Sequence, residues 1–259
     1  MKYNMSIFKT MTLVFSFLLG QTVAFGGHAE GLKVAVAGNF YKPLLQIAAR
    51  YHQDTGHRLL ISTGSTGKLY AQIRNGAPFE FFMAADQVRP SQLVAEGMAL
   101  ADSQFTYAQG RLVLWSNQND LVDQQGKVLN NFQLPYLAIS NPKTAPYGAA
   151  SVTVLKNLEL YQQLQPKLVE GQSVGQTFQQ VSSGAAPLGF VALSQVYVDG
   201  EISHGSAWIV PSDLYQAIKQ DAVILKKGEG NPQAKAFLSY LQTPPIQALI
   251  KSFGYQVNE

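Results

Sequence analysis

The chain has 259 residues, of which 46% are hydrophobic and 14% charged, so it is expected to fold around an apolar core as one large or two small domains. It contains no cysteine, which excludes a disulfide framework, a thiolate nucleophile and a cysteine-ligated metal. The four histidines lack metal-ligand spacing, and no basic run with interleaved aromatic residues occurs, so neither a histidine metal site nor nucleic acid binding is expected.

The first segment reads as a secretory signal. Lys2 and Lys9 flank a positive start, an apolar run covers residues 11–25, and "GGHAE" offers small residues for cleavage. We predict a signal peptide over residues 1–29, cut after Ala29, and a mature protein in the periplasm. An uncleaved anchor is the alternative, but the run is short for the roughly 20 residues of a membrane span. Cleavage leaves 17 basic and 16 acidic residues, a nearly neutral chain.

Beyond the signal, short apolar runs alternate with helical periods. This alternation predicts an α/β protein with mixed, mostly parallel sheets flanked by helices. The expected strands are residues 32–38, 58–62, 79–86, 111–116, 136–140, 188–194, 207–211 and 222–228. The expected helices are residues 42–56, 69–74, 90–97, 148–164, a short one after Val174, 232–241 and 245–253.

The stretch "STGSTGKLYAQI" (62–73) allows three interpretations. It fails as a nucleotide P-loop, because Ser62 replaces the first glycine and Leu69 replaces the hydroxyl residue after Lys68. Ser65 and Lys68 fit the S-x-x-K pair of acyl-enzymes, but the companion motifs of that family are missing. A strand, a polar turn and a helix start also suit an anion at the helix N-terminus. Taken by itself, the stretch is better explained by an ordinary N-cap from Ser65 or Thr66, because every helix needs its first donors satisfied.

The same design recurs along the chain. "AGNFYKP" (37–43), "APYGAA" followed by Ser151, and "GQSVGQ" (171–176) each place small or polar residues before a helix. Parallel strands bring such turns to one edge of a sheet, where open α/β sheets bind ligands. Converging helix starts would hold a small multivalent anion with neutral groups only. No pair of carboxylates at helical spacing points to acid–base chemistry.

These segments, together with "QIRNGAPFEFFMAAD" (72–86), "RLVLWS" (111–116), "GAAPLGFVALSQ" (184–195) and the tail 231–255, resemble the periplasmic molybdate-binding proteins of bacterial ABC transporters. The resemblance covers residues 32–255. It implies a type II periplasmic binding protein with two α/β lobes and a ligand cleft between them. The lobes would be residues 31–108 plus 213–259, and residues 109–212.

The resemblance also implies the ligand-binding residues. Gly38 and Asn39 occupy the first binding loop, where many members of the family have serine, and an asparagine amide can donate as a hydroxyl does. Ser65 matches the serine of the second loop. Tyr147 and Val174 occupy the positions that give main-chain N–H groups. Ala192 replaces a tyrosine whose hydroxyl donates a hydrogen bond to the ligand in some members. Either Tyr147 or Asn39 supplies the missing donor, or the site is weaker.

The expected function is therefore capture of molybdate or tungstate and delivery to a membrane permease. The family uses no cofactor, no directly coordinated metal and no catalysis, and the chain is expected to be a monomer. A binding protein for sulfate, phosphate or an organic acid remains an alternative, although a carboxylate binder should carry a convergent arginine. Two further alternatives are an acyl-enzyme that uses Ser65 and Lys68, and the ligand-sensing domain of a regulator.

Overall fold

The computed structural model describes residues 31–257. The predicted signal peptide and its cleavage site lie outside the described residues. Within residues 31–257, no helix has the length and apolar character that crossing a membrane requires.

The first sheet has five strands in the order β2-β1-β3-β12-β4. Their bounds are β1 Leu32–Ala37, β2 Leu59–Gly64, β3 Phe81–Met83, β4 Phe105–Gly110 and β12 Ile218–Ile224. β1 pairs in parallel with β2 and β3, whereas β12 is antiparallel to β3 and β4. Only β12 therefore opposes the other strands, and the carboxyl ends of β1, β2 and β3 meet at one edge of this sheet.

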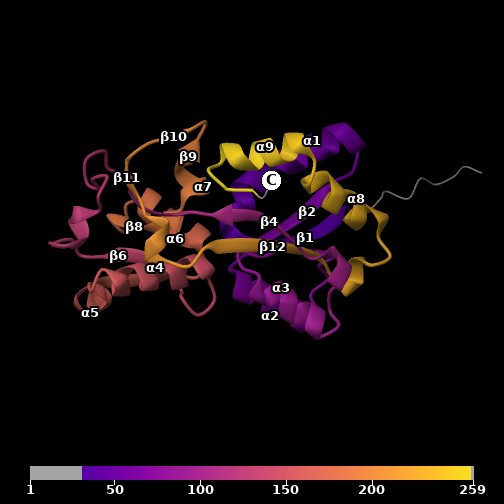
Figure 1. The fold of residues 1–259 in the computed structure, drawn as a ribbon, viewed down its shortest axis with the longest axis horizontal. Helices are drawn as coiled ribbons and strands as arrows, with labels where there is room; N and C mark the ends of the chain where they lie inside the picture. The colour runs from indigo at the N-terminus through magenta and orange to yellow at the C-terminus, as the bar shows by residue number, and fades with distance from the viewer. Residues whose placement is uncertain (1–30, 258–259) are drawn as a thin grey trace, which may run out of the picture. The chain divides into compact units, whose positions relative to one another are not determined.

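Helices cover both faces of the first sheet (Figure 1). They are α1 Tyr41–Thr55, α2 Thr66–Arg74, α3 Val88–Ala95, α8 Pro232–Leu241 and α9 Pro244–Ser252. On one face α1, α8 and α9 pack on alternate residues of β1, among them Leu32, Val34 and Val36. On the other face α2 and α3 pack on Ala35. Because β1 is buried on both faces, its sequence is a continuous apolar run apart from Lys33.

The second sheet also has five strands, in the order β11-β5-β8-β6-β7. Their bounds are β5 Leu112–Ser116, β6 Leu137–Ser140, β7 Leu168–Gly171, β8 Leu188–Ala192 and β11 Ser206–Ile209. β6 is parallel to β7 and β8, and β5 is antiparallel to β8 and β11. A separate hairpin joins β9 Tyr197–Val198 and β10 Glu201–Ile202.

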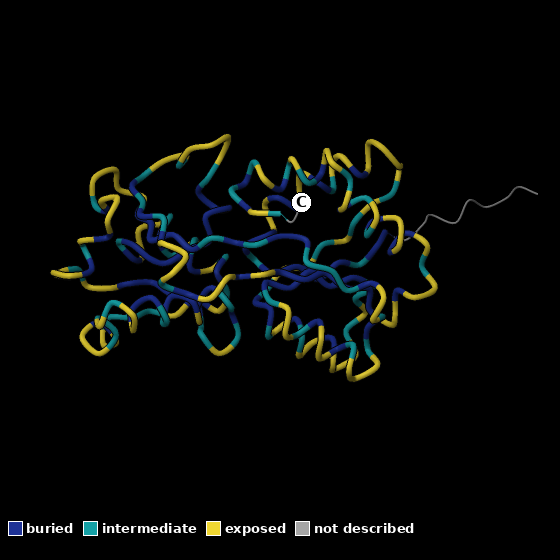
Figure 2. The backbone as a smooth tube through the Cα atoms, in the orientation of Figure 1, coloured by how far each residue is buried: buried dark blue, intermediate teal, exposed yellow. Residues whose placement is uncertain are grey.

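Helices again flank this sheet, and the strands lie buried between them (Figure 2). They are α4 Pro146–Asn157, α5 Tyr161–Leu164, α6 Val174–Ser182 and α7 Leu193–Val196. On one face α4 and α5 pack against Leu112 and Leu114 of β5. On the other face α6 and α7 pack against Val113 and Trp115 of the same strand. The predicted fold class, two mixed sheets flanked by helices, is confirmed. We call each sheet with its helices a lobe.

Several expected elements have different bounds in the structure; the strand expected over 79–86, for example, is only β3, Phe81–Met83. Two further differences have a clear structural description. The helix predicted over 148–164 is two helices, because Glu159 adopts a left-handed conformation (φ 61°) that ends α4 and turns the chain into α5. The last predicted strand starts four residues earlier, at Ile218 of β12, and its end at 226–228 forms a 3-10 turn. Strands β4 and β7 were not predicted, since their sequences "FTYAQG" and "LVEG" lack a sustained apolar pattern.

Candidate functional site

The carboxyl ends of strands from both sheets, and the helix starts that follow them, surround one small cavity. Its lining consists of Ala37, Gly38, Asn39, Gly64, Ser65, Thr66, Ala85, Ala145, Pro146, Tyr147 and Val174. All five residues predicted to bind a ligand are in this set, although they are up to 136 positions apart in sequence. None of the lining residues carries a charge. The cavity is small in this structure, about 10 Å³, which is roughly the space that one water molecule needs.

Ser65 does not act as the cap of the helix that it begins. It occupies the N-cap position of α2, yet its side chain makes no capping hydrogen bond. The residue is 3% exposed, and among the described residues its Oγ has no hydrogen-bond partner. A buried hydroxyl without a partner costs about 1–3 kcal/mol. The ordinary cap that the sequence also allowed is therefore absent, and the hydroxyl is available to a ligand.

Tyr147 and Val174 lie at helix starts of the second lobe. Tyr147 follows Pro146 at the beginning of α4, where the N-cap Ala145 has no side-chain oxygen to offer. Val174 is the first residue of α6. The first N–H groups of a helix have no acceptor within it and carry the positive end of its dipole. Both residues line the cavity, so their main-chain donors lie near it, and their role in binding an anion, which the resemblance implies, stays a prediction.

Gly38 and Asn39 form a 3-10 turn between β1 and α1. Gly38 is close to the second lobe, since a Cβ atom there would lie 3.2 Å from the main-chain nitrogen of Gly175. The Asn39 amide nitrogen donates to Gln220 Oε1 at 2.7 Å and to the Tyr255 hydroxyl at 2.9 Å. Its Oδ1 is buried and has no partner among the described residues. The side-chain donor expected from Asn39 is thus engaged behind the cavity.

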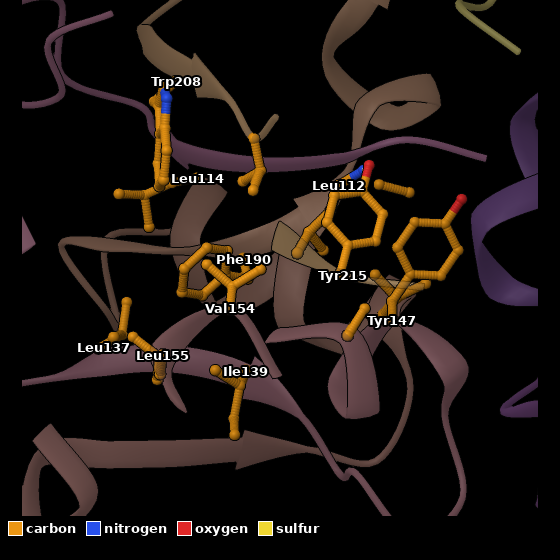
Figure 3. Close-up of a cluster of buried hydrophobic side chains, with 14 of the residues drawn as sticks. Leu112, Leu114, Leu137, Ile139, Tyr147, Val154, Leu155, Phe190, Trp208 and Tyr215 are labelled. Carbon is orange, nitrogen blue, oxygen red and sulfur yellow. The ribbon is translucent and has the colours of Figure 1, made fainter. Parts of the chain in front are cut away.

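The hydroxyl expected to replace the tyrosine absent at Ala192 is also engaged elsewhere. Tyr147 lies at the margin of the second lobe's apolar cluster, with its hydroxyl directed away from Leu112 and Tyr215 (Figure 3). That oxygen accepts a hydrogen bond from Gln220 Nε2 at 3.2 Å. Ala192 itself ends β8 and gives its N–H to Gln195 Oε1 at 3.0 Å. Ser65 is therefore the one cavity-lining side chain of the described structure whose hydroxyl has no partner.

Sequence reasoning missed the residues that support the cavity. Thr66 also lines it, and its Oγ1 accepts the N–H of Ala85 at 3.0 Å, which ties the second binding loop to the end of β3. Gln220, fully buried on β12, and Tyr255, near the C-terminus, both contact Asn39. The only sequence signal was the polar run Lys219–Asp221 within β12.

The geometry argues against nucleophilic catalysis. Lys68 Nζ of α2 donates to Gln172 Oε1 of the second lobe at 2.5 Å, and no hydrogen bond joins Lys68 to Ser65. An activated serine needs a base within hydrogen-bond reach. The part of the chain that the structure describes also contains no group of histidine, aspartate and glutamate residues that could hold a metal ion. The arrangement can bind an anion through neutral donors, but it lacks the parts for acyl transfer.

The two lobes touch around the cavity. Gly67 N–H donates to the carbonyl of Thr144 at 2.8 Å, so the start of α2 meets the loop before α4. Ser194 Oγ of the second lobe donates to the carbonyl of Asn39 at 2.9 Å. A larger cavity of about 450 Å³ shares Gly38 and Gly64 with the small one and opens beside it. These contacts enclose the small cavity between the lobes.

Known proteins resemble this chain over nearly its whole described length. The family described as bacterial extracellular solute-binding protein matches residues 32–256. The molybdate-binding protein ModA of Azotobacter vinelandii is 52% identical over 233 residues, which are 90% of this chain and 92% of that protein. ModA of Rhodobacter capsulatus is 48% identical over 221 residues, 85% of this chain and 86% of that protein.

Solved structures agree with these relatives. The periplasmic molybdate-binding protein of Azotobacter vinelandii has a TM-score of 0.85 and 46% sequence identity, with 88% of this chain and 100% of that chain covered. The structure of PEB3 bound to L-phospholactate has a TM-score of 0.66 at 11% identity, covering 88% of this chain and 100% of that chain, and shares the fold alone.

Proposed function

The chain belongs to the bacterial extracellular solute-binding proteins, and we propose that it captures molybdate, or tungstate, and delivers it to the membrane permease of an ABC transporter. It is a binding protein and not an enzyme, and molybdate is cargo and not a cofactor. The relatives near 50% identity are named for molybdate binding, which favours this ligand. Function in the periplasm, export by the N-terminal signal peptide and a monomeric state are parts of the same proposal.

The unpartnered Ser65 hydroxyl in an uncharged cavity is the observation that carries the proposal. Gly38, Asn39, Ser65, Tyr147 and Val174 would surround the oxyanion, with main-chain N–H groups at four helix starts and one hydroxyl replacing its water shell. Such donors need no counter-charge, because the helix dipoles and N–H groups favour negative charge. Hydrogen phosphate fits worse, since its own O–H group would face hydrogen-bond donors and find no acceptor.

We further propose that the lobes, residues 31–108 plus 213–259 and residues 109–212, close around the ligand as on a hinge. Two crossings connect them: one between β4 and β5, and one between β11 and β12. The anion contacts both lobes, so it binds the closed state more tightly and shifts the population toward it.

Isothermal titration calorimetry of the mature chain with molybdate, tungstate, sulfate and phosphate tests the proposal. We expect submicromolar binding of molybdate or tungstate and much weaker binding of the other two. Submicromolar binding of sulfate, together with no heat signal from molybdate, would overturn the assignment. An organic-acid binder is disfavoured by the absence of any arginine among the residues that line the cavity.

A further inference from the structure

A buried polar network lies directly behind the cavity and contacts the first binding loop. Its centre is Gln220 of β12, which is 0% exposed. Gln220 Oε1 accepts from Asn39 Nδ2 at 2.7 Å and from the Tyr107 hydroxyl at 3.0 Å, and Gln220 Nε2 donates to the Tyr147 hydroxyl at 3.2 Å. Asn39 and Tyr107 belong to the first lobe, whereas Tyr147 belongs to the second. One amide on a strand at the crossing between lobes therefore contacts both of them.

Tyr255 makes a second connection of the same kind. Its hydroxyl receives a hydrogen bond from Asn39 Nδ2 at 2.9 Å and lies 3.0 Å from the Asn39 carbonyl and 2.9 Å from Ser194 Oγ of the second lobe. The C-terminal segment that carries Tyr255 pairs with β4, since the main chains of Gln109 and Gln256 exchange hydrogen bonds of 2.7 and 3.0 Å. The tyrosine is thereby fixed to a strand that leads into the crossing.

The network is better explained by alignment of the site than by packing. An apolar side chain would fill the place of Gln220 without the desolvation cost of a buried amide. Instead, the amide oxygen accepts hydrogen bonds from Asn39 and Tyr107, and the amide nitrogen donates one to Tyr147. A β-bulge between Gln220 and Asp221 changes the register of β12 at this point, as bulges that re-aim a side chain do.

We propose that Gln220 and Tyr255 are positioning residues for anion capture. They hold the Gly38–Asn39 loop in its binding geometry, and their hydrogen bonds are complete only when Tyr147 and Ser194 of the second lobe are within reach. Closure of the lobes and alignment of the first binding loop are then a single event. This inference rests on the proposed function and adds to it the residues that couple the hinge to the site.

The first test is a double-mutant cycle measured by calorimetry with molybdate. Tyr255→Phe and Gln220→Met each remove hydrogen bonds at nearly constant volume, and each should weaken binding about tenfold. In an Asn39→Ala background the same substitutions should change the dissociation constant by less than about threefold, because they act through Asn39. Gln256→Met is the matched control, since it breaks only the side-chain bond to Gln109, and it should leave binding unchanged.

The second test measures closure directly. The chain has no cysteine, so Gln92→Cys on α3 and Gln163→Cys on α5, both exposed, give one spin label on each lobe. With molybdate we expect a single short distance in the parent protein and a mixture of short and long distances in Tyr255→Phe. Thermal unfolding without ligand checks that each variant folds, and Tyr255→Phe is the mild substitution if Gln220→Met does not fold.

The outcomes separate this inference from the proposed function. If the parent protein binds molybdate but Tyr255→Phe and Gln220→Met bind it equally well, the positioning role is wrong and the function stands. Equal losses of molybdate affinity in the parent and in the Asn39→Ala background would also overturn the positioning role, because they would show a general structural effect. If the parent binds sulfate or phosphate instead, the proposed ligand is wrong, and the same cycle with that anion decides the positioning role. If the parent protein binds none of these anions, both the proposed function and the positioning role are wrong.

Discussion

At the scale of the residue, two serines at helix starts show how similar positions take different roles. Ser173 is the N-cap of α6, and its Oγ accepts the N–H of Gln176 at 3.3 Å. Ser65 is the N-cap of α2 but makes no such bond, and its hydroxyl is buried without a partner among the described residues. Ser173 thus stabilises its own helix, whereas Ser65 leaves a donor for an anion.

This contrast predicts opposite effects of two identical substitutions. Ser65→Ala should weaken molybdate binding by about 1–3 kcal/mol, because a ligand oxygen loses its donor, and should leave the free energy of unfolding of the ligand-free protein unchanged or higher. Ser173→Ala should lower that free energy by about 0.5–2 kcal/mol and change binding little. Calorimetry and urea unfolding measure the two quantities. An unchanged isotherm for Ser65→Ala would remove Ser65 from the site.

The buried tyrosines predict a loss of stability at alkaline pH. Burial raises the pKa of Tyr107, Tyr147 and Tyr255 well above the usual value for tyrosine. Above pH ~10 the unfolded chain loses these protons while the folded protein keeps them, so the free energy of unfolding falls by about 1.4 kcal/mol per pH unit for each such tyrosine. Below pH ~9 the three hydroxyls stay neutral in both states and contribute no pH dependence.

Urea unfolding at several pH values between 9 and 11 measures this slope. Tyr255→Phe removes one of the three groups, so its slope should be shallower by as much as 1.4 kcal/mol per pH unit, an approximate upper limit for one proton. Identical slopes in the two proteins would show that Tyr255 ionises in the folded state as it does in the unfolded one.

At the scale of the element, the end of α4 contains a strained position. Glu159 has φ 61°, a conformation that favours glycine, and the Leu160 N–H reaches back to the Leu155 carbonyl at 2.8 Å as in a Schellman cap. Glu159→Gly should therefore raise the free energy of unfolding by as much as 1 kcal/mol, roughly the net of relieved strain and added chain entropy. Glu159→Ala removes the charge but keeps the Cβ, so it should bring no gain in the same denaturant titration.

The same turn shows why sequence patterns located most elements but not every boundary. Apolar residues continue with helical spacing through Leu155, Leu158 and Leu164, so the pattern predicted one helix where the chain turns. Without a glycine at position 159 nothing marked the end of α4. Strand β4 was missed for the opposite reason: Gln109 and Gly110 break its apolar pattern, and cross-strand pairing with β12 holds it in place.

The candidate site also has a part that could be predicted from the sequence and a part that could not. The loops with Gly38, Ser65, Tyr147 and Val174 follow strands in a regular order, so sequence and resemblance predicted that they converge. The supporting residues come from places that no local pattern relates, such as the β12 bulge at Gln220 and the C-terminal Tyr255. Contacts made only by tertiary structure leave no periodic signal in the chain.

At the scale of the whole described chain, main chains of the two lobes come close together at Gly67. Its N–H donates to the Thr144 carbonyl at 2.8 Å. A Cβ atom at Gly67 would lie 3.1 Å from both the Cα and the carbonyl oxygen of Thr144, closer than side chains normally approach. Thr144 belongs to the second lobe, so this restriction applies to the contact between the lobes and not to the first lobe by itself.

Gly67→Val therefore provides a test of lobe closure that leaves the cavity lining intact, since Gly67 does not line the cavity. The branched side chain should prevent full approach of Thr144 and weaken molybdate binding by about 1–3 kcal/mol, the usual cost of overpacking. Gly67→Ala should lose less affinity, because Thr144 needs to shift by only a few tenths of an ångström.

Unfolding without ligand should change little in either variant if the ligand-free protein spends most of its time open. Small-angle scattering with saturating molybdate should then show less contraction for Gly67→Val than for the parent. Equal contraction and equal affinity in both proteins would mean that tight contact between these two loops is not required for capture.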